Sequence, residues 1–256
     1  MKMKFLGKRV LLALGVVALS LGITMSSARA DFIIDTFGDS QTVIAGRQGA
    51  TVFPNPSNSV VATANAVGSV RDITVMRTAT TSTTATSYVE GDSGANSFSL
   101  NASAKATGFG FVTYHASGPM YTGLGSVDLT QGGLNSAFIF QNAFSTQTVT
   151  VDVFVWQSSS KFAQGTLTIP GTDPALGIDL QLLFTSFVFS GGANASIFSA
   201  AGAVGFRVNG VKGSDTEFQL LKTAPRVIPE PASFALVGMG MLGTGFAAYR
   251  RRKMAI

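Results

Sequence analysis

Apolar and polar side chains alternate along several short stretches in the middle of the chain. In residues 148–156, four valines occupy every second position and would share one face. Shorter alternating runs occur at 109–113, 179–189, 204–209 and 218–220. A period of two residues predicts half-buried β-strands, whereas an amphipathic helix needs a period near 3.6 that no stretch between 31 and 223 sustains.

Clusters of Gly, Asn, Asp and Pro separate these runs and predict turns. They lie at 91–94, 132–133, 170–174, 191–192 and 209–210. About a dozen short strands without intervening helices fit a single all-β, antiparallel β-sandwich over residues 31–223. No repeat of fixed period is present, which argues against a propeller or a solenoid. Most of the 20 phenylalanines are expected to fill the space between the sheets.

Composition removes several kinds of chemistry. The 256 residues include no cysteine and one histidine, and only 12% are charged. Disulfides, thiolate nucleophiles and Cys-based metal sites are therefore excluded, and a single histidine rules out most His-based metal sites. The net charge of +5 comes from the chain ends, because residues 31–229 hold nine basic and twelve acidic side chains. This mildly acidic body does not predict nucleic-acid binding.

The first thirty residues have the pattern of a secretory signal peptide. A basic start precedes an apolar run at 10–23, and the small residues Ala28 and Ala30 stand at positions −3 and −1 of a cleavage site. Cleavage by signal peptidase would make Asp31 the mature N-terminus. An uncleaved anchor is the alternative, but fourteen apolar residues are short for a span of about 30 Å.

The last thirty residues have three parts in a fixed order. A linker over 224–231 ends in a Pro-Glu-Pro tripeptide, an apolar segment follows at 232–249, and a basic tail occupies 250–256. The residues that define this pattern are Pro229, Glu230, Pro231, Arg250, Arg251 and Arg252. Eighteen helical residues are about 27 Å long, enough for one transmembrane helix, and the positive-inside rule keeps the tail cytoplasmic.

This order, behind a signal peptide, resembles the PEP-CTERM sorting signal of Gram-negative bacteria. The resemblance implies that an exosortase, a membrane transpeptidase-like enzyme, processes the tail, and that the protein accompanies exopolysaccharide production. It also implies an exported protein that is first anchored in the inner membrane and then released to the cell surface or extracellular matrix. A permanent single-span anchor is the alternative.

Several motifs of the body resemble a recurrent type of PEP-CTERM ectodomain. They lie at 34–37, 71–72, 127–130 and 204–210, with Asp215 after the last. The resemblance implies a jelly-roll-like sandwich of unassigned activity. Thr36 stands where that group has a second acid, so no metal role is expected there. No cofactor is expected, although a carboxylate-only site would suit a structural Ca²⁺.

Two serine motifs resemble hydrolase motifs but lack a general base. Residues 37–41 resemble the nucleophile block of GDSL-type esterases, and 91–94 resemble the trypsin-like serine block. The single histidine, His115, stands after an aromatic run and is expected at a strand end. No carboxylate pair of the glycosidase type stands out either. Trp156 is expected to fill the core or, if exposed, to stack on a sugar, and residues 78–87 to form a polar strand or a loop.

Three functions therefore stay open. The sequence favours a non-catalytic surface or matrix protein, with a carbohydrate-binding module and a glycoside or polysaccharide hydrolase as alternatives. A strip of exposed aromatic side chains would favour the binding module, and convergent acids the hydrolase.

Overall fold

The computed structural model describes residues 31–46, 55–80, 88–171 and 177–225. The predicted signal peptide with Ala28 and Ala30, the apolar segment 232–249 and the sorting residues Pro229 to Arg252 lie outside these ranges. In the described part, no helix has the length and apolarity to cross a membrane. The chain divides into two units after Pro225, and only the first contains described residues.

The described residues form β-strands joined by turns and by short 3₁₀ segments. The strands are β1 Phe32–Asp35, β2 Gln41–Ala45, β3 Asn55–Ala62, β4 Val70–Thr80, β5 Val89–Gly94, β6 Ser97–Ala102, β7 Ala106–His115, β8 Ala137–Ser145, β9 Val149–Trp156, β10 Phe162–Ile169, β11 Ile178–Leu183, β12 Val188–Ser190, β13 Ala203–Gly210, β14 Asp215–Phe218 and β15 Leu220–Ala224. The 3₁₀ segments are η1 Val67–Ser69, η3 Phe184–Ser186 and η4 Ala195–Ser199.

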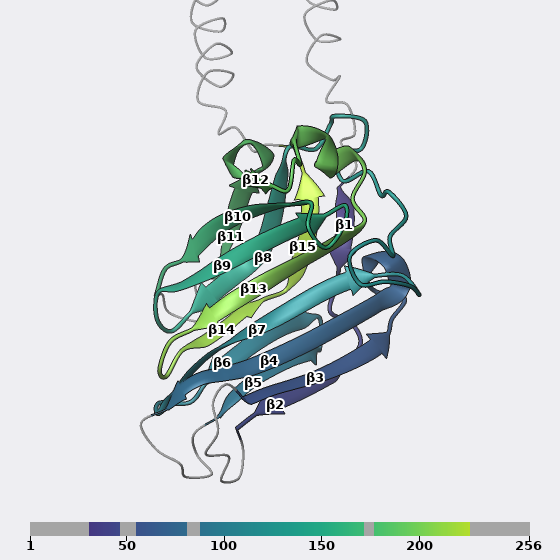
Figure 1. The fold of residues 1–256 in the computed structure, drawn as a ribbon. Helices are drawn as coiled ribbons and strands as arrows, with labels where there is room; N and C mark the ends of the chain where they lie inside the picture. Colours follow the sequence, from purple (N-terminus) through teal and green to yellow (C-terminus); the bar gives the residue numbers. More distant parts are fainter. Residues whose placement is uncertain (1–30, 47–54, 81–87, 172–176, 226–256) are drawn as a thin grey trace, which may run out of the picture. The chain divides into compact units, whose positions relative to one another are not determined.

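The strands form two antiparallel sheets that lie in two layers (Figure 1). The eight-stranded sheet has the order β1-β15-β8-β14-β6-β5-β2, with β11 also paired to β8. The seven-stranded sheet has the order β12-β10-β9-β13-β7-β4-β3. The chain's late strands β13 and β14 lie centrally, between earlier strands of each sheet. The predicted all-β antiparallel sandwich is confirmed.

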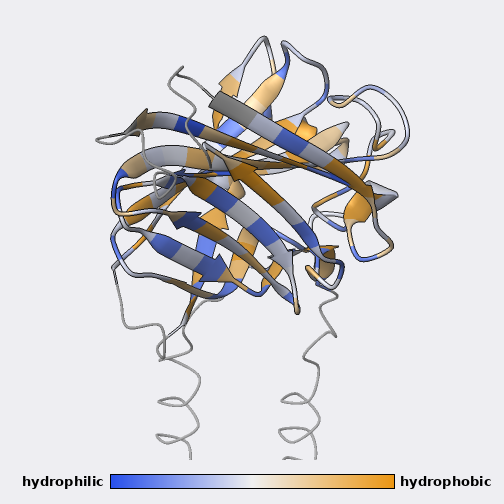
Figure 2. Ribbon diagram, turned by 90° about the horizontal axis from the view of Figure 1, so that it is seen from below, coloured by the Kyte–Doolittle hydropathy of each residue, from blue (hydrophilic) through white to orange (hydrophobic). Residues whose placement is uncertain are grey.

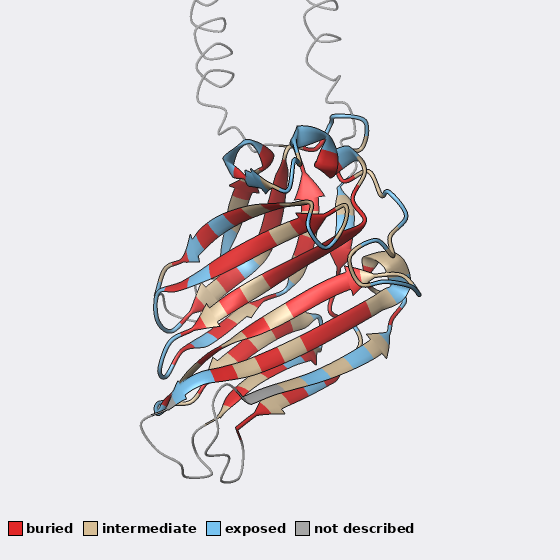
Figure 3. Ribbon diagram, in the orientation of Figure 1, coloured by how far each residue is buried: buried red, intermediate tan, exposed pale blue. Residues whose placement is uncertain are grey.

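The alternating pattern of the sequence becomes an inner and an outer face. In β9, the four valines at 149, 151, 153 and 155 are buried between the sheets. Figure 2 shows polar and apolar positions alternating along the strands, and Figure 3 shows buried and half-buried residues alternating in the same way. Among the described residues, nine phenylalanines belong to the core between the sheets: Phe37, Phe98, Phe138, Phe140, Phe184, Phe187, Phe198, Phe206 and Phe218.

Two predicted turns are wrong. Residues 91–94 belong to β5, and Asn209 and Gly210 belong to β13. Gly91 lies in a strand because the sheets approach closely there: a Cβ atom at Gly91 would lie 2.8 Å from Val75 Cγ2. The turn after β5 is instead made by Ala95 and Asn96, both with positive φ, as in a type I′ hairpin.

A fully buried ion pair joins β1 of the eight-stranded sheet to β4 of the seven-stranded sheet. The Arg71 guanidinium donates to Asp35 Oδ2 at 2.9 Å and to Gln41 Oε1 at 3.0 Å. Both charged side chains have no solvent exposure. Burial raises the pKa of Asp35 above its ordinary value, and this outweighs the opposing effects of Arg71 and of the Phe37 amide. Motifs that are far apart in sequence thus form one buried network.

Candidate functional site

The outer face of the seven-stranded sheet carries an unusual set of side chains for a solvent-facing surface. Strand register places Phe111, Arg207, Asp152 and Thr166 opposite one another across β7, β13, β9 and β10. The same alternation that buries the valines of β9 points Asp152 and Phe154 outward. This face is therefore a continuous platform across four neighbouring strands.

Aromatic rings cluster on this platform, and we call Phe109, Phe111, Phe154 and Trp156 the aromatic strip. The Phe154 and Trp156 rings are stacked, with centroids 5.3 Å apart and an interplanar angle of 14°. Phe111 meets Phe154 edge to face at 5.8 Å, and Tyr121 lies 5.5 Å from Trp156. The three phenylalanines are half-buried, whereas Trp156 is only 6% exposed. The strip thus presents partly exposed rings to solvent.

A polar cluster lies beside the rings and is centred on Asp152. Arg207 donates to Asp152 Oδ2 from Nη2 at 2.7 Å, Asn209 donates to the same oxygen at 3.0 Å, and Thr166 donates to Oδ1 at 2.7 Å. Burial acts to raise the pKa of Asp152, but these donors outweigh it and hold the pKa below the ordinary value. The carboxylate is therefore ionised and neutralises Arg207.

Arg207 also joins the polar cluster to the rings. Its guanidinium carbon lies 5.6 Å from the centroid of Phe109 and 5.8 Å from that of Phe154, in cation–π range. The Arg207 side chain remains 37% exposed. Because Nε and Nη2 donate to Asp152, the guanidinium is fixed in place, and Nη1 has no hydrogen-bond partner among the described residues.

A glycine makes room for the tryptophan. Gly205 lies opposite Phe154 on the neighbouring strand. A Cβ atom at Gly205 would lie 2.6 Å from the Val112 carbonyl oxygen and 3.1 Å from Trp156 Cζ3. Residues 204–210, singled out by resemblance, therefore supply the space beneath Trp156 and two of the groups that hold Asp152.

The two serine motifs lie in a loop and in a strand. Ser40 is exposed in a loop, and Asp39 beside it accepts a hydrogen bond from Thr63. Ser93 is buried in β5 and donates to the Asp39 carbonyl oxygen at 3.0 Å. His115 ends β7, as expected, and its Nδ1 lies 2.8 Å from the Ala116 carbonyl oxygen. Neither serine has a hydrogen bond to His115.

A group of four acids lies on the opposite side of the sandwich. Glu90 and Asp92 of β5 and Asp215 and Glu217 of β14 alternate with inward-facing residues, so they face outward from the eight-stranded sheet. Strand β6 separates the two pairs. Among the described residues, no group of three or more His, Asp or Glu side chains could hold a metal ion.

The sequence pattern pointed to some residues of this platform but not to the strand pairing that brings them together. Trp156 was a candidate for sugar stacking or core filling; it is nearly buried, yet it lies outside the space between the sheets. Asp152 and the partly exposed Phe109 and Phe111 had no motif to single them out. The alternation of residues 109–113 and 148–156 was the available signal, but strand pairing was needed to bring the two runs together.

Comparison with protein families adds the decisive observation on the tail. Residues 227–253 match the PEP-CTERM protein-sorting motif. This chain carries an exosortase sorting signal. The match covers the predicted Pro-Glu-Pro tripeptide and arginine cluster, and it supports processing of the chain by an exosortase and export across the inner membrane. A search of curated proteins gives no match.

Solved structures with a similar arrangement include carbohydrate-binding modules. A family 11 module from Clostridium thermocellum, solved in complex with a β-1,3-1,4-mixed-linked tetrasaccharide, is 11% identical, with a TM-score of 0.36 over 78% of this chain and 98% of that one. The family 11 module of the cellulosomal cellulase Lic26A-Cel5E from the same organism is 11% identical, with a TM-score of 0.37 over 80% and 99%. An agarase is 11% identical, with a TM-score of 0.37 over 55% and 22%.

Proposed function

We propose that this chain is an exported, exosortase-sorted protein whose body is a non-catalytic, polysaccharide-binding β-sandwich of the jelly-roll type. The observation that carries the proposal is the aromatic strip with its polar cluster on the outer face of the seven-stranded sheet. Sorting would place this face at the cell surface or in the extracellular matrix, where exopolysaccharide would be the polymer available for binding.

The chemistry of the platform matches that of a sugar chain. A pyranose ring has C–H groups on its faces and hydroxyl groups around its edge. Partly exposed phenylalanine rings complement the C–H groups. The Arg207 Nη1 donor and the Asn209 Oδ1 acceptor complement the hydroxyl groups, because Asn209 Nδ2 already donates to Thr150 and Asp152. Rings held by stacking and by the Arg207 contacts are already in place before a ligand arrives, which lowers the entropic cost of binding.

We infer a non-catalytic role, and the environment of Asp152 on the platform supports it. Asp152 accepts four hydrogen bonds from three residues, and it would lose some of them if it acted as a general acid or a nucleophile. Asp72, the other acid on this face, is 5% exposed. We therefore expect that a polysaccharide bound here is held and not cleaved.

Affinity electrophoresis of residues 31–225 in gels that contain neutral or acidic polysaccharides tests this proposal. We expect one or more polysaccharides to retard the protein, and we expect Phe154→Ala to weaken retention tenfold or more, as for a central aromatic contact. Thr42→Ala, on the outer face of the other sheet, is the matched control and should bind normally. Retention that is unchanged in Phe154→Ala, or release of reducing ends from the gel polysaccharide, would contradict the proposal.

A further inference from the structure

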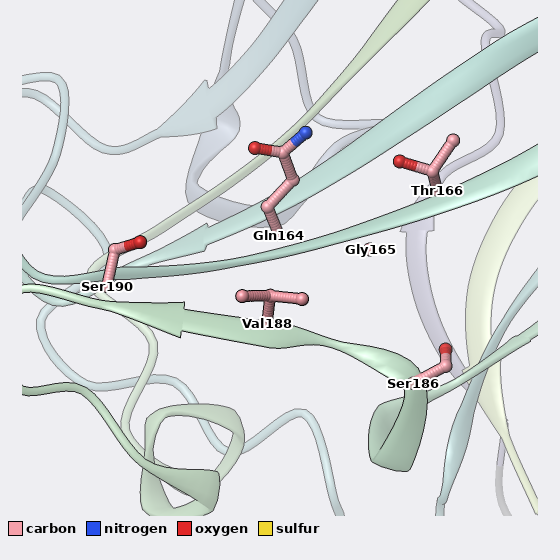
Figure 4. Close-up of a pocket in the computed structure, with 6 residues that line it drawn as sticks. All are labelled: Gln164, Gly165, Thr166, Ser186, Val188 and Ser190. Carbon is pink, nitrogen blue, oxygen red and sulfur yellow. The ribbon is translucent and has the colours of Figure 1, made fainter.

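A pocket lies at the edge of the platform, where β12 and β10 diverge. Strand β12 pairs with β10 only from Phe162 to Gln164, and the chain before it turns away through η3. The fork between them encloses about 460 Å³, within the range of small-ligand sites. Figure 4 shows the side chains of Gln164 and Thr166 projecting from β10. Ser186 and Val188 line the opposite wall of the pocket.

The lining of this pocket is polar but uncharged. It consists of the Gln164 amide, three hydroxyl side chains, the glycine backbone of β10 and one valine that is 71% exposed. Thr166 and Ser186 donate their hydroxyl protons to Asp152 and to the Leu183 carbonyl, so both remain acceptors. Within the described ranges, the Gln164 side-chain amide has no hydrogen bond of its own, so both of its ends are available to a ligand.

The pocket is continuous with the aromatic strip. Gln164 lies directly opposite Phe154, and Thr166 lies directly opposite Asp152. Side chains in such positions are about 5 Å apart at their Cβ atoms. From β7 to β12 the platform crosses four strand spacings, about 19 Å in all. A sugar chain that lies across the strands over Phe154 would therefore put its next unit into the pocket.

We propose that this pocket is a subsite for one neutral sugar unit of the bound polysaccharide. The proposal rests on the proposed function and names its substrate class. Donors and acceptors without charge suit hydroxyl groups, whereas a uronate or a sulfate would lose its hydration without gaining a cation, since Asp152 already neutralises the nearby Arg207. The exposed Val188 supplies an apolar contact for a ring face.

The test is a binding titration of the full chain in mild detergent. The probes are neutral cello-, laminari- and malto-oligosaccharides of two to six units, with oligogalacturonides of the same lengths as the acidic set. We expect affinity for a neutral series to rise with length until the pocket is filled. Ser186→Trp, which fills the pocket from η3, should remove the last step of that rise, and Gln164→Ala should weaken long oligosaccharides about tenfold.

Two controls separate the possible failures. Thr185→Trp adds the same side chain to η3 outside the pocket lining and should bind as the unmodified chain does. If Phe154→Ala weakens binding while Ser186→Trp and Gln164→Ala do not, the subsite is overturned and the proposed function stands. If oligogalacturonides bind as tightly as the neutral oligosaccharides, and Ser186→Trp abolishes their binding, the proposal that the pocket takes a neutral sugar is overturned. If no probe binds, or if Phe154→Ala changes nothing, the proposed function falls and the subsite falls with it.

Discussion

At the scale of single residues, the charged groups that matter most are the buried ones. Asp35, in a fully buried ion pair, is the clearest case. Its partner Arg71 is 36 positions away, and local sequence contains no signal for such a pair. The sequence does show that charged residues are few, only 12% of the chain. We therefore interpret a buried charge in this body as one with a specific structural role.

Loss of one partner of the Asp35–Arg71 pair should be costly. Arg71→Met leaves a carboxylate buried without its cation, and we expect the free energy of unfolding to fall by about 3–5 kcal/mol. Lys222→Met removes the partly exposed pair with Asp31 and should cost about 1 kcal/mol or less. Urea denaturation of both variants measures the difference. Equal losses would show that burial of the pair has no special effect.

The polar cluster of the platform should make stability depend on pH. The pKa of Asp152 is below its ordinary value of 3.8 in the folded protein. Its carboxylate therefore stabilises the fold fully above that value, and this contribution is lost as the pH falls through the folded-state pKa. The stability difference between the unmodified protein and Asp152→Asn should shrink from pH 7 to about pH 2.5. A constant or growing difference would contradict the cluster as described.

At the scale of elements, the alternation of polar and apolar residues predicted the strands more accurately than clusters of glycine predicted the turns. The run at 148–156 corresponds to β9, and the run at 204–209 to β13. Gly91 was misjudged because it serves the close approach of the two sheets and not a turn. The hairpin at Ala95 and Asn96 was missed because alanine is a poor residue for positive φ.

That hairpin offers a stabilising substitution. Type I′ turns favour Asn followed by Gly, whereas this chain has Ala95 with φ 50° and Asn96 with φ 64°. Ala95→Asn combined with Asn96→Gly should raise the free energy of unfolding by about 1 kcal/mol. Thermal unfolding followed by circular dichroism would show it as a higher midpoint. A lower midpoint would mean that the turn has another geometry.

At the scale of the whole molecule, the body and the tail have separate tasks. All residues of the described core lie between Ile34 and Ala224, and the first and last strands pair with each other. The antiparallel sandwich could be predicted from alternation alone, and the sorting signal from its three-part order. The platform on the outer face could not, because it depends on which strands are neighbours.

The tail should control processing without affecting the fold. Replacing Pro229, Glu230 and Pro231 with alanine should preserve membrane insertion but block exosortase processing, so that full-length protein accumulates in the membrane of an exosortase-bearing host. Replacing residues 250–253 with serine should weaken retention and orientation, because the positive charges hold the tail inside. Mass spectrometry of the mature protein decides: residues 232–250 still attached would favour a permanent anchor.

The central claim, that the platform binds polysaccharide, has a built-in reporter. Trp156 is the only tryptophan of the chain, and it is stacked on Phe154 within the aromatic strip. Tryptophan fluorescence of the full chain, titrated with a polysaccharide that retards the protein in affinity gels, therefore reports on this face alone. The account predicts a saturable change in emission that Phe154→Ala shifts to a polysaccharide concentration tenfold higher or more. Binding that saturates in the gel while the emission of Trp156 stays constant would contradict it.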